Sequence, residues 1–263
     1  MVLVSQLLGS LGRLAVIFVE EVGQTGLLAR KTTGQIVRMK SEPVAVQMIR
    51  FGIRAIPIVS LVNLFVGMIV AVSMSELLRQ LGVLNWTSRI VAVSITRELA
   101  PLMTAIVMCG FAGAAIAAEI GTMNVNEEIL ALEVGAMSPV RLLVMPRLLG
   151  VCLMMMCLTL VGMVMGMFGG YIVGTGLLDI GSHNYLEGNN EAVRWSDIPK
   201  GLIKAFAFGM IITLVACRQG FKATGGALGV GKSTTSAVVI SICLIIFANL
   251  CFAVLFNWTL AGP

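Results

Sequence analysis

Residues 97–147 read RELAPLMTAIVMCGFAGAAIAAEIGTMNVNEEILALEVGAMSPVRLLVMPR, and in this stretch an uncharged run passes directly into a charged one. The uncharged run extends over 20 residues, from Leu99 to Ala118. At about 1.5 Å per residue, a helix of that length crosses a hydrocarbon core of about 30 Å. The sequence therefore predicts a transmembrane helix that leaves the membrane at Glu119.

Small residues recur at every fourth position of this predicted helix. Rows of this kind let a neighbouring helix approach until the two backbones are in contact. The two rows consist of Gly110, Ala114 and Ala118, and of Gly113, Ala117 and Gly121. We therefore expect the helix to pack closely against other helices through these residues.

A short acidic helix is predicted directly after the span, at about residues 124–136. Asn126 is a suitable N-cap, Gly135 is placed to end the helix, and carboxylates in the first turn interact favourably with the helix dipole. The helix has too few apolar residues to cross a membrane, so we expect a coupling helix that lies on the cytosolic surface and contacts a partner. The side chains offered to that partner are Glu127, Glu128 and Glu133.

The composition of the whole chain is that of a helical membrane protein. Of its 263 residues, 58% are hydrophobic and only 12% are charged. The 29 glycines and 17 methionines, against 6% aromatic residues, favour packed transmembrane helices over a β-barrel with aromatic girdles. The six cysteines show no metal-ligand spacing, so we interpret them as buried thiols and predict no metal site.

The chain is predicted to divide into an N-terminal region, residues 1–54, and a five-span membrane domain, residues 55–263. In the first region we expect an interfacial helix at about 5–28, followed by a basic connector. A signal peptide is the alternative, and it is disfavoured because Arg13 interrupts the apolar run. The five spans are predicted at 55–75, 99–118, 148–178, 202–217 and 236–258.

Two polar features lie near the fourth span. Residues 179–200 are predicted to form an extramembrane loop, and His183 is interpreted as an ordinary residue of that loop. Lys204 falls near the start of the span, where we expect its side chain to extend toward the membrane interface.

The distribution of basic residues predicts the orientation of the chain. Twelve Lys and Arg residues fall on the side of the N-terminus and the acidic helix, against six on the opposite side. Because cytosolic segments are enriched in these residues, the N-terminus is expected in the cytosol and the C-terminus in the periplasm. The net charge of +5 is thereby explained by topology, without a nucleic-acid partner.

Residues 226–233 read GALGVGKS and satisfy the phosphate-binding pattern G-x-x-x-x-G-K-[ST]. A working P-loop also needs a preceding strand and an α/β domain, whereas this segment lies between two apolar spans. We therefore expect a glycine-rich turn in which Lys232 faces anionic headgroups or a partner.

Several motifs in this chain match those of one permease family. They are RELAP at 97–101, AAEIGTM at 117–123, EILALE at 128–133, SPVR at 138–141, PR at 146–147 and GVGKSTT at 229–235. Through them, over roughly residues 45–258, the chain resembles the MlaE-like permeases, the membrane subunits of bacterial phospholipid ABC transporters. It departs from the family at Phe111, where many members have Arg, and at Asn249, where many have Asp.

The resemblance implies a homodimer in the bacterial inner membrane. It also implies two cytosolic ATPase subunits that carry the ATP and magnesium, a periplasmic lipid-binding MCE-domain partner and, often, a small STAS-domain protein. No cofactor is expected on this chain itself. The implied function is movement of phospholipid between the inner membrane and the MCE carrier, which contributes to outer-membrane lipid asymmetry.

The residues themselves also favour a transporter over an enzyme, because no nucleophile, base and orienting group form a cluster. Arg97 and Glu98 are the candidates for the substrate path, since ionisable groups at the edge of a span are costly and often functional. The alternative is an ion pair that anchors the helix at the interface. A secondary transporter or channel is disfavoured because the spans hold few charges and no inverted repeat, and a membrane-embedded lipid enzyme because no catalytic cluster is present.

Overall fold

The computed structural model describes residues 42–260, and this part of the chain contains helices and no strand. Five of its helical segments are long and apolar enough to cross a membrane, which confirms the predicted all-helical fold with five spans. These segments are Pro43–Gln80, Leu84–Val125, Val140–Gly176, Asp197–Phe221 and Gly226–Phe256. The interfacial helix expected at 5–28 lies outside the described residues.

The first span contains two helices joined by a short 3₁₀ turn. Helix α2 (Glu42–Phe51) is joined through the 3₁₀ turn η2 (Ile53–Ala55) to α3 (Ile56–Gln80), so the end of the predicted basic connector is helical. Gly52 lies at the junction, where a Cβ atom would come within 2.2 Å of Met154 Cε on another helix. The junction therefore requires glycine.

The second span is a continuous run of helical segments and is longer than predicted. It comprises η3 (Leu84–Trp86), α4 (Thr87–Ser94), the π-helical η4 (Ile95–Leu99), α5 (Ala100–Met108), the π-helical η5 (Cys109–Gly113) and α6 (Ala114–Val125). The helix extends beyond the predicted span, Leu99–Ala118, at both ends, because the charges at Arg97, Glu98 and Glu119 pair with other helices and do not interrupt this one.

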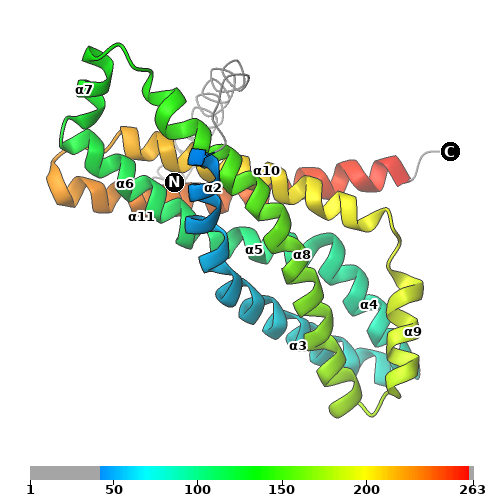
Figure 1. Ribbon diagram of the computed structural model, residues 1–263. Helices are drawn as coiled ribbons and strands as arrows, with labels where there is room; N and C mark the ends of the chain where they lie inside the picture. Colours follow the sequence, from blue (N-terminus) through cyan, green and yellow to red (C-terminus); the bar gives the residue numbers. More distant parts are fainter. Residues whose placement is uncertain (1–41, 261–263) are drawn as a thin grey trace, which may run out of the picture.

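The acidic helix and the third span follow. Helix α7 (Glu128–Val134) is connected through the π-helical η6 (Val140–Val144) to α8 (Met145–Gly176). Figure 1 shows α7 and α9 (Ser182–Ala192) at opposite ends of the molecule. The predicted loop at 179–200 thus contains a helix, on which His183 lies, because Tyr185 packs into α8 at Gly174.

The last two spans are joined by a very short turn. Helix α10 (Asp197–Phe221) is followed by α11 (Gly226–Leu260), so residues 226–233 form the first turns of a helix. The expected glycine-rich turn was therefore wrong in its position: it lies at Gly225 and Gly226, which adopt the left-handed backbone conformation with φ of 84° and 73°. A helical GALGVGKS segment cannot wrap around a phosphate as a P-loop does.

Two groups of helices pack closely within the bundle. Helix α3 crosses α8 with direct backbone contact, because a Cβ atom at Gly67 would lie 1.9 Å from the Gly166 carbonyl oxygen. Helices α6, α10 and α11 pack against one another, and buried apolar side chains such as Ile116, Ile120 and Ile212 fill the core there (Figure 1).

Candidate functional site

A π-helical turn presents Arg97 and Glu98 to the fourth span. The segment η4 (Ile95–Leu99) holds both residues, and their partners lie on α10. A π turn inserts an extra residue into a helix and occurs frequently at functional sites. Here two adjacent side chains of the second span pair with two residues of α10, Asp197 and Lys204.

Arg97 forms a two-point ion pair with Asp197. Its Nε lies 2.9 Å from Asp197 Oδ1, and its Nη2 donates a hydrogen bond of 3.0 Å to Oδ2. Asp197 is 1% exposed and also accepts a hydrogen bond from the Arg194 backbone N–H, while Lys200 Nζ lies 3.9 Å from Oδ1. Such bidentate pairs fix the orientation of both groups. Arg97 nevertheless keeps 34% of its side chain exposed.

Glu98 is held by two donors from different helices. Lys204 Nζ lies 2.6 Å from Glu98 Oε1, and Asn249 Nδ2 of α11 donates a hydrogen bond of 3.1 Å to Oε2. Lys204 also donates to the Arg97 carbonyl oxygen at 3.2 Å and lies 5.9 Å from the Phe256 ring centre. The site therefore joins the second, fourth and fifth spans.

The prediction for Lys204 was wrong. Its side chain does not extend to the interface: it is 1% exposed, because α10 begins at Asp197, two turns earlier, and places Lys204 inside the bundle. A buried ammonium group requires a carboxylate partner, which Glu98 supplies. Sequence reasoning also gave Asn249 no role, although its amide can donate to Glu98 where an ionised Asp could not.

We call these five charged residues the ionic cluster. It has more cations than carboxylates, and so carries a net positive charge at neutral pH. The members are Arg97, Lys200 and Lys204, with Glu98 and Asp197. Arg97 and Glu98 thus each form an ion pair with a residue of α10, and both side chains remain partly exposed.

Helix α7 has the predicted position but a different N-terminus. Its N-cap is Glu127, with a φ of 63°, and the Asn126 side chain instead donates to Glu128 Oε1 at 3.4 Å, so the N-cap assigned to Asn126 was wrong. The helix ends at Val134 with Gly135 as C-cap, as predicted. Glu127, Glu128 and Glu133 are exposed.

The surface of α7 is also strongly apolar. Val134 is 83% exposed and Leu130 is 55% exposed, whereas Ile129 is buried against the bundle. An apolar surface of this kind beside three carboxylates is typical of a docking surface. The sequence analysis had named only the acidic side chains.

The two rows of small residues in α6 and η5 have different surroundings. Gly113, Ala117 and Gly121 are buried, and a Cβ atom at Gly121 would lie 3.1 Å from Ala223 Cβ. This row therefore packs against the end of α10, as predicted. Gly110 is exposed and Ala114 is partly exposed, so the other row faces outward.

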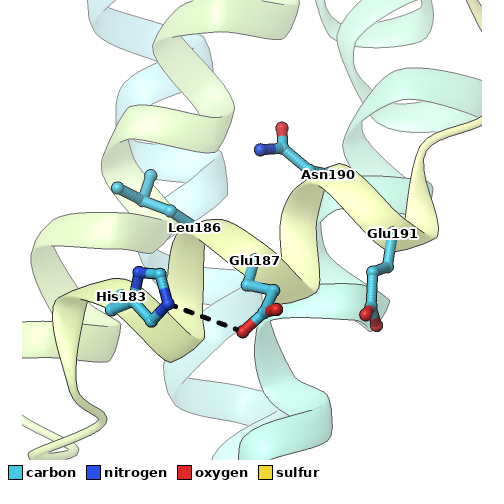
Figure 2. Close-up of a pocket in the computed structure, with 5 residues that line it drawn as sticks. All are labelled: His183, Leu186, Glu187, Asn190 and Glu191. Atoms are coloured by element: carbon cyan, nitrogen blue, oxygen red, sulfur yellow. Dashed lines mark ion pairs between the residues drawn. The ribbon is translucent and has the colours of Figure 1, made fainter.

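A surface hollow of about 390 Å³ shares no residue with the ionic cluster. Figure 2 shows the residues that line it, along one face of α9. Its lining consists of His183, Leu186, Glu187, Asn190 and Glu191. All five residues come from a single helix, so the hollow is an open surface without enclosing walls, and His183 Nε2 lies 3.9 Å from Glu187 Oε2 within it.

Helix α9 is fixed to the bundle by an aromatic contact. Tyr185 is buried and meets the Tyr171 ring edge-on, with 5.8 Å between the ring centres. Burial raises the pKa of the Tyr185 hydroxyl to about 12, because the phenolate would be poorly solvated there. Tyr185 is thus a neutral anchor at physiological pH.

Comparison with known proteins gives matches over nearly the whole chain. The family described as Permease MlaE matches residues 44–255. A probable ABC transporter permease protein of Rickettsia felis is 34% identical over 94% of this chain and 96% of its own length. The intermembrane phospholipid transport system permease protein MlaE of Haemophilus influenzae is 31% identical over 88% and 90%. Protein TRIGALACTOSYLDIACYLGLYCEROL 1 of Arabidopsis thaliana, a chloroplastic protein, is 36% identical over 77% of this chain and 58% of its own length.

Proposed function

This chain belongs to the MlaE permease family, and we propose that it is the membrane subunit of an ABC transporter that moves phospholipid between the bacterial inner membrane and a periplasmic MCE-domain carrier. In this proposal, lipid transport in either direction between the membrane and the carrier contributes to outer-membrane lipid asymmetry. The observation that carries the proposal is the ionic cluster within the spans, at a distance from an exposed acidic and apolar helix, α7.

The proposed orientation places α7 and the α10–α11 turn in the cytosol. The excess of Lys and Arg on that side supports it. Helix α9 and the C-terminus then lie in the periplasm, and the ionic cluster lies toward the periplasmic ends of the spans.

The ionic cluster is the proposed contact for the lipid headgroup. Its net positive charge favours an anionic phosphate, and the partly exposed guanidinium of Arg97 is its most accessible cation. A phosphate that approaches Arg97 competes with Asp197 for the same donors. In the proposed path the acyl chains follow apolar residues of the first two spans, where side chains such as Phe65 and Ile69 face outward.

Helix α7 is the proposed docking element for the ATPase. Val134 and Leu130 provide apolar anchors, and Glu128 and Glu133 provide charges for a basic groove. ATP and magnesium belong to that ATPase dimer in the proposal. The further partners are a second copy of this chain, the MCE-domain protein and a STAS-domain protein, and the outward row with Gly110 offers a close-packing face for the second copy.

Reconstitution tests this function. The chain, co-expressed with the ATPase and the MCE-domain protein of the same organism, is expected to co-purify with both and to transfer fluorescent phospholipid in proteoliposomes only when ATP is hydrolysed. Arg97→Gln is expected to slow transfer while the ATPase stays bound, and Arg79→Gln, on the exposed end of α3, serves as the control. Lipid or ion movement by the isolated chain without ATP would instead support a secondary transporter or channel.

A further inference from the structure

A second group of charges joins three helices at the end of the bundle that carries α7. Glu119 on α6 lies between two guanidinium groups: Arg50 Nη1 of α2 is 2.6 Å from its Oε1, and Arg147 Nη2 of α8 is 2.9 Å from its Oε2. The Arg147 side chain is 6% exposed, that of Glu119 29% and that of Arg50 46%. We call Arg50, Glu119 and Arg147 the charge clasp.

The charge clasp closes the segment that contains α7. Glu119 lies midway along α6, the helix that leads into α7, and Arg147 lies in the first turn of α8, which follows α7 through η6. Both chain segments that connect α7 to the membrane spans are therefore bound to each other by one ion pair. Asn124 adds a second attachment, because its Nδ2 donates to the Phe221 and Ala223 carbonyl oxygens at the end of α10.

The clasp also includes the helix that precedes the first span. Arg50 lies in the last turn of α2, directly before the junction at Gly52, and α2 packs on α8, where a Cβ atom at Gly150 would lie 2.9 Å from Gln47 Cβ. Through Glu119, α2 is thus attached to α6 as well as to α8.

The charge clasp joins the three helices through charged side chains, where apolar side chains could also have packed. Removing a guanidinium from water costs free energy, and apolar residues of similar size often stabilise a fold equally well. Charged hydrogen bonds, however, are directional and fix the relative position of the groups that they join. Arg147 is held further by the hydrogen bond of its Nη1 to the Leu143 carbonyl oxygen, at 2.7 Å.

We propose that Glu119 is a positioning residue for energy coupling: it joins α6, α8 and α2 so that a displacement of α7 moves all three together. The inference rests on the proposed function, in which α7 receives the motion of the ATPase. The clasp shares no residue with the ionic cluster, and in the proposed function the nucleotide is bound by the ATPase, so loss of the clasp is expected to affect the transmission of motion between the two sites.

The test measures phospholipid transferred per ATP hydrolysed by the complete reconstituted complex. Glu119→Gln keeps the shape of the side chain and removes its charge. We expect the ATPase to remain bound and hydrolysis to continue, while transfer per ATP falls about ten-fold or more, the factor that corresponds to losing one hydrogen bond between charged groups. Glu191→Gln on α9, which breaks the exposed ion pair with Arg89 of α4, is the matched control and is expected to leave the ratio unchanged.

Arg50 provides a second variant that does not threaten the fold, because its side chain is half exposed. Arg50→Ala is expected to lower the amount of phospholipid transferred per ATP, and Arg50→Lys is expected to keep most of the wild-type value. A side chain that acted only through its volume would not show this dependence on charge. An unchanged ratio in both Glu119→Gln and Arg50→Ala, or an equal fall in hydrolysis and transfer with loss of the bound ATPase, would overturn the inference. Failure of the proposed function would be recognised separately, because the wild-type complex itself would then transfer no phospholipid.

Discussion

Lys204 and Glu98 form an ion pair of 2.6 Å in which the two partners differ greatly in their contact with solvent. The Lys204 side chain is 1% exposed, whereas that of Glu98 is 40% exposed. The free-energy cost of losing the pair therefore depends on which partner is removed, because only the ammonium group is left without water.

This asymmetry predicts unequal losses of stability. Glu98→Ala leaves a buried charge without its partner and is expected to lower the free energy of unfolding by about 3–5 kcal/mol. Lys204→Met keeps the side-chain volume, and Glu98 then retains Asn249 and solvent, so its loss is expected to be clearly smaller. Thermal unfolding in detergent measures both, and the combined Glu98→Gln and Lys204→Met variant should recover most of the stability. Equal losses for the two single variants would contradict this account.

The proposed orientation can be checked by labelling single cysteines in intact cells. Glu187→Cys on α9 should react with a membrane-impermeant maleimide, whereas Glu128→Cys on α7 and Lys222→Cys at the end of α10 should react only after the cells are opened. The exposed native cysteines at positions 157, 243 and 251 are first replaced by serine. Labelling of position 222 from outside would exclude the proposed topology.

The helical form of residues 226–233 predicts that this segment binds no nucleotide. Lys232 is exposed in the second turn of α11, and the backbone N–H groups beyond the first turn are directed along the helix axis toward carbonyl groups, away from any phosphate. The purified chain should not bind ATP, and Lys232→Ala should leave nucleotide binding by the assembled complex unchanged. Magnesium-dependent binding of ATP to the isolated chain, abolished by Lys232→Ala, would show that residues 226–233 do bind nucleotide and would contradict this prediction.

Because α7 is exposed, substitutions on it are expected to affect binding of the ATPase without affecting folding of the chain. Exposed charges contribute about 0–1 kcal/mol to stability, but a charge in a desolvated interface can contribute about 2–5 kcal/mol to binding. Glu128→Lys combined with Glu133→Lys should therefore leave the chain inserted in the membrane while it weakens ATPase binding or uncouples hydrolysis from lipid movement.

Val134→Asp should weaken the same association through loss of an apolar anchor, since 83% of this side chain is exposed in the free chain. Glu76→Lys, on the exposed end of α3, is the control for a change of charge elsewhere. Wild-type ATPase association and lipid-stimulated hydrolysis in the double glutamate variant would exclude α7 as the coupling element.

Hydropathy predicted the existence of the spans because the length of an apolar run is a local property. The ends of the spans were less predictable. Glu119 was taken as the end of a helix, although its pairing with Arg50 and Arg147, 69 and 28 positions away, allows α6 to continue to Val125. Such pairing depends on packing between distant segments, which one sequence does not reveal.

The sequence identified only part of the candidate site, again because the site is formed by segments that are distant in the chain. Arg97 and Glu98 were identified because charges at the edge of a span are unusual, but their partners lie about 100 positions later. Asp197 fell in the predicted extramembrane loop, and Lys204 was expected to extend toward the membrane interface. The apolar surface of α7 was missed because the spacing of Leu130 and Val134 indicates one face of a helix without indicating whether that face is inward or outward.

The contact between Gly67 and Gly166 has a consequence for how the protein can move. No side chain separates the two backbones, so there are no rotamers that could adjust if α3 slid along α8, and a shift of one residue would drive the side chain of Val66 or Met68 against a carbonyl group. We therefore expect the two helices to move together. In the proposed transport, an opening wide enough for a lipid is then expected on the other side of the bundle, where α10 meets the second span through the ionic cluster and α11 meets it through Asn249, because those ion pairs and hydrogen bonds can break and form again.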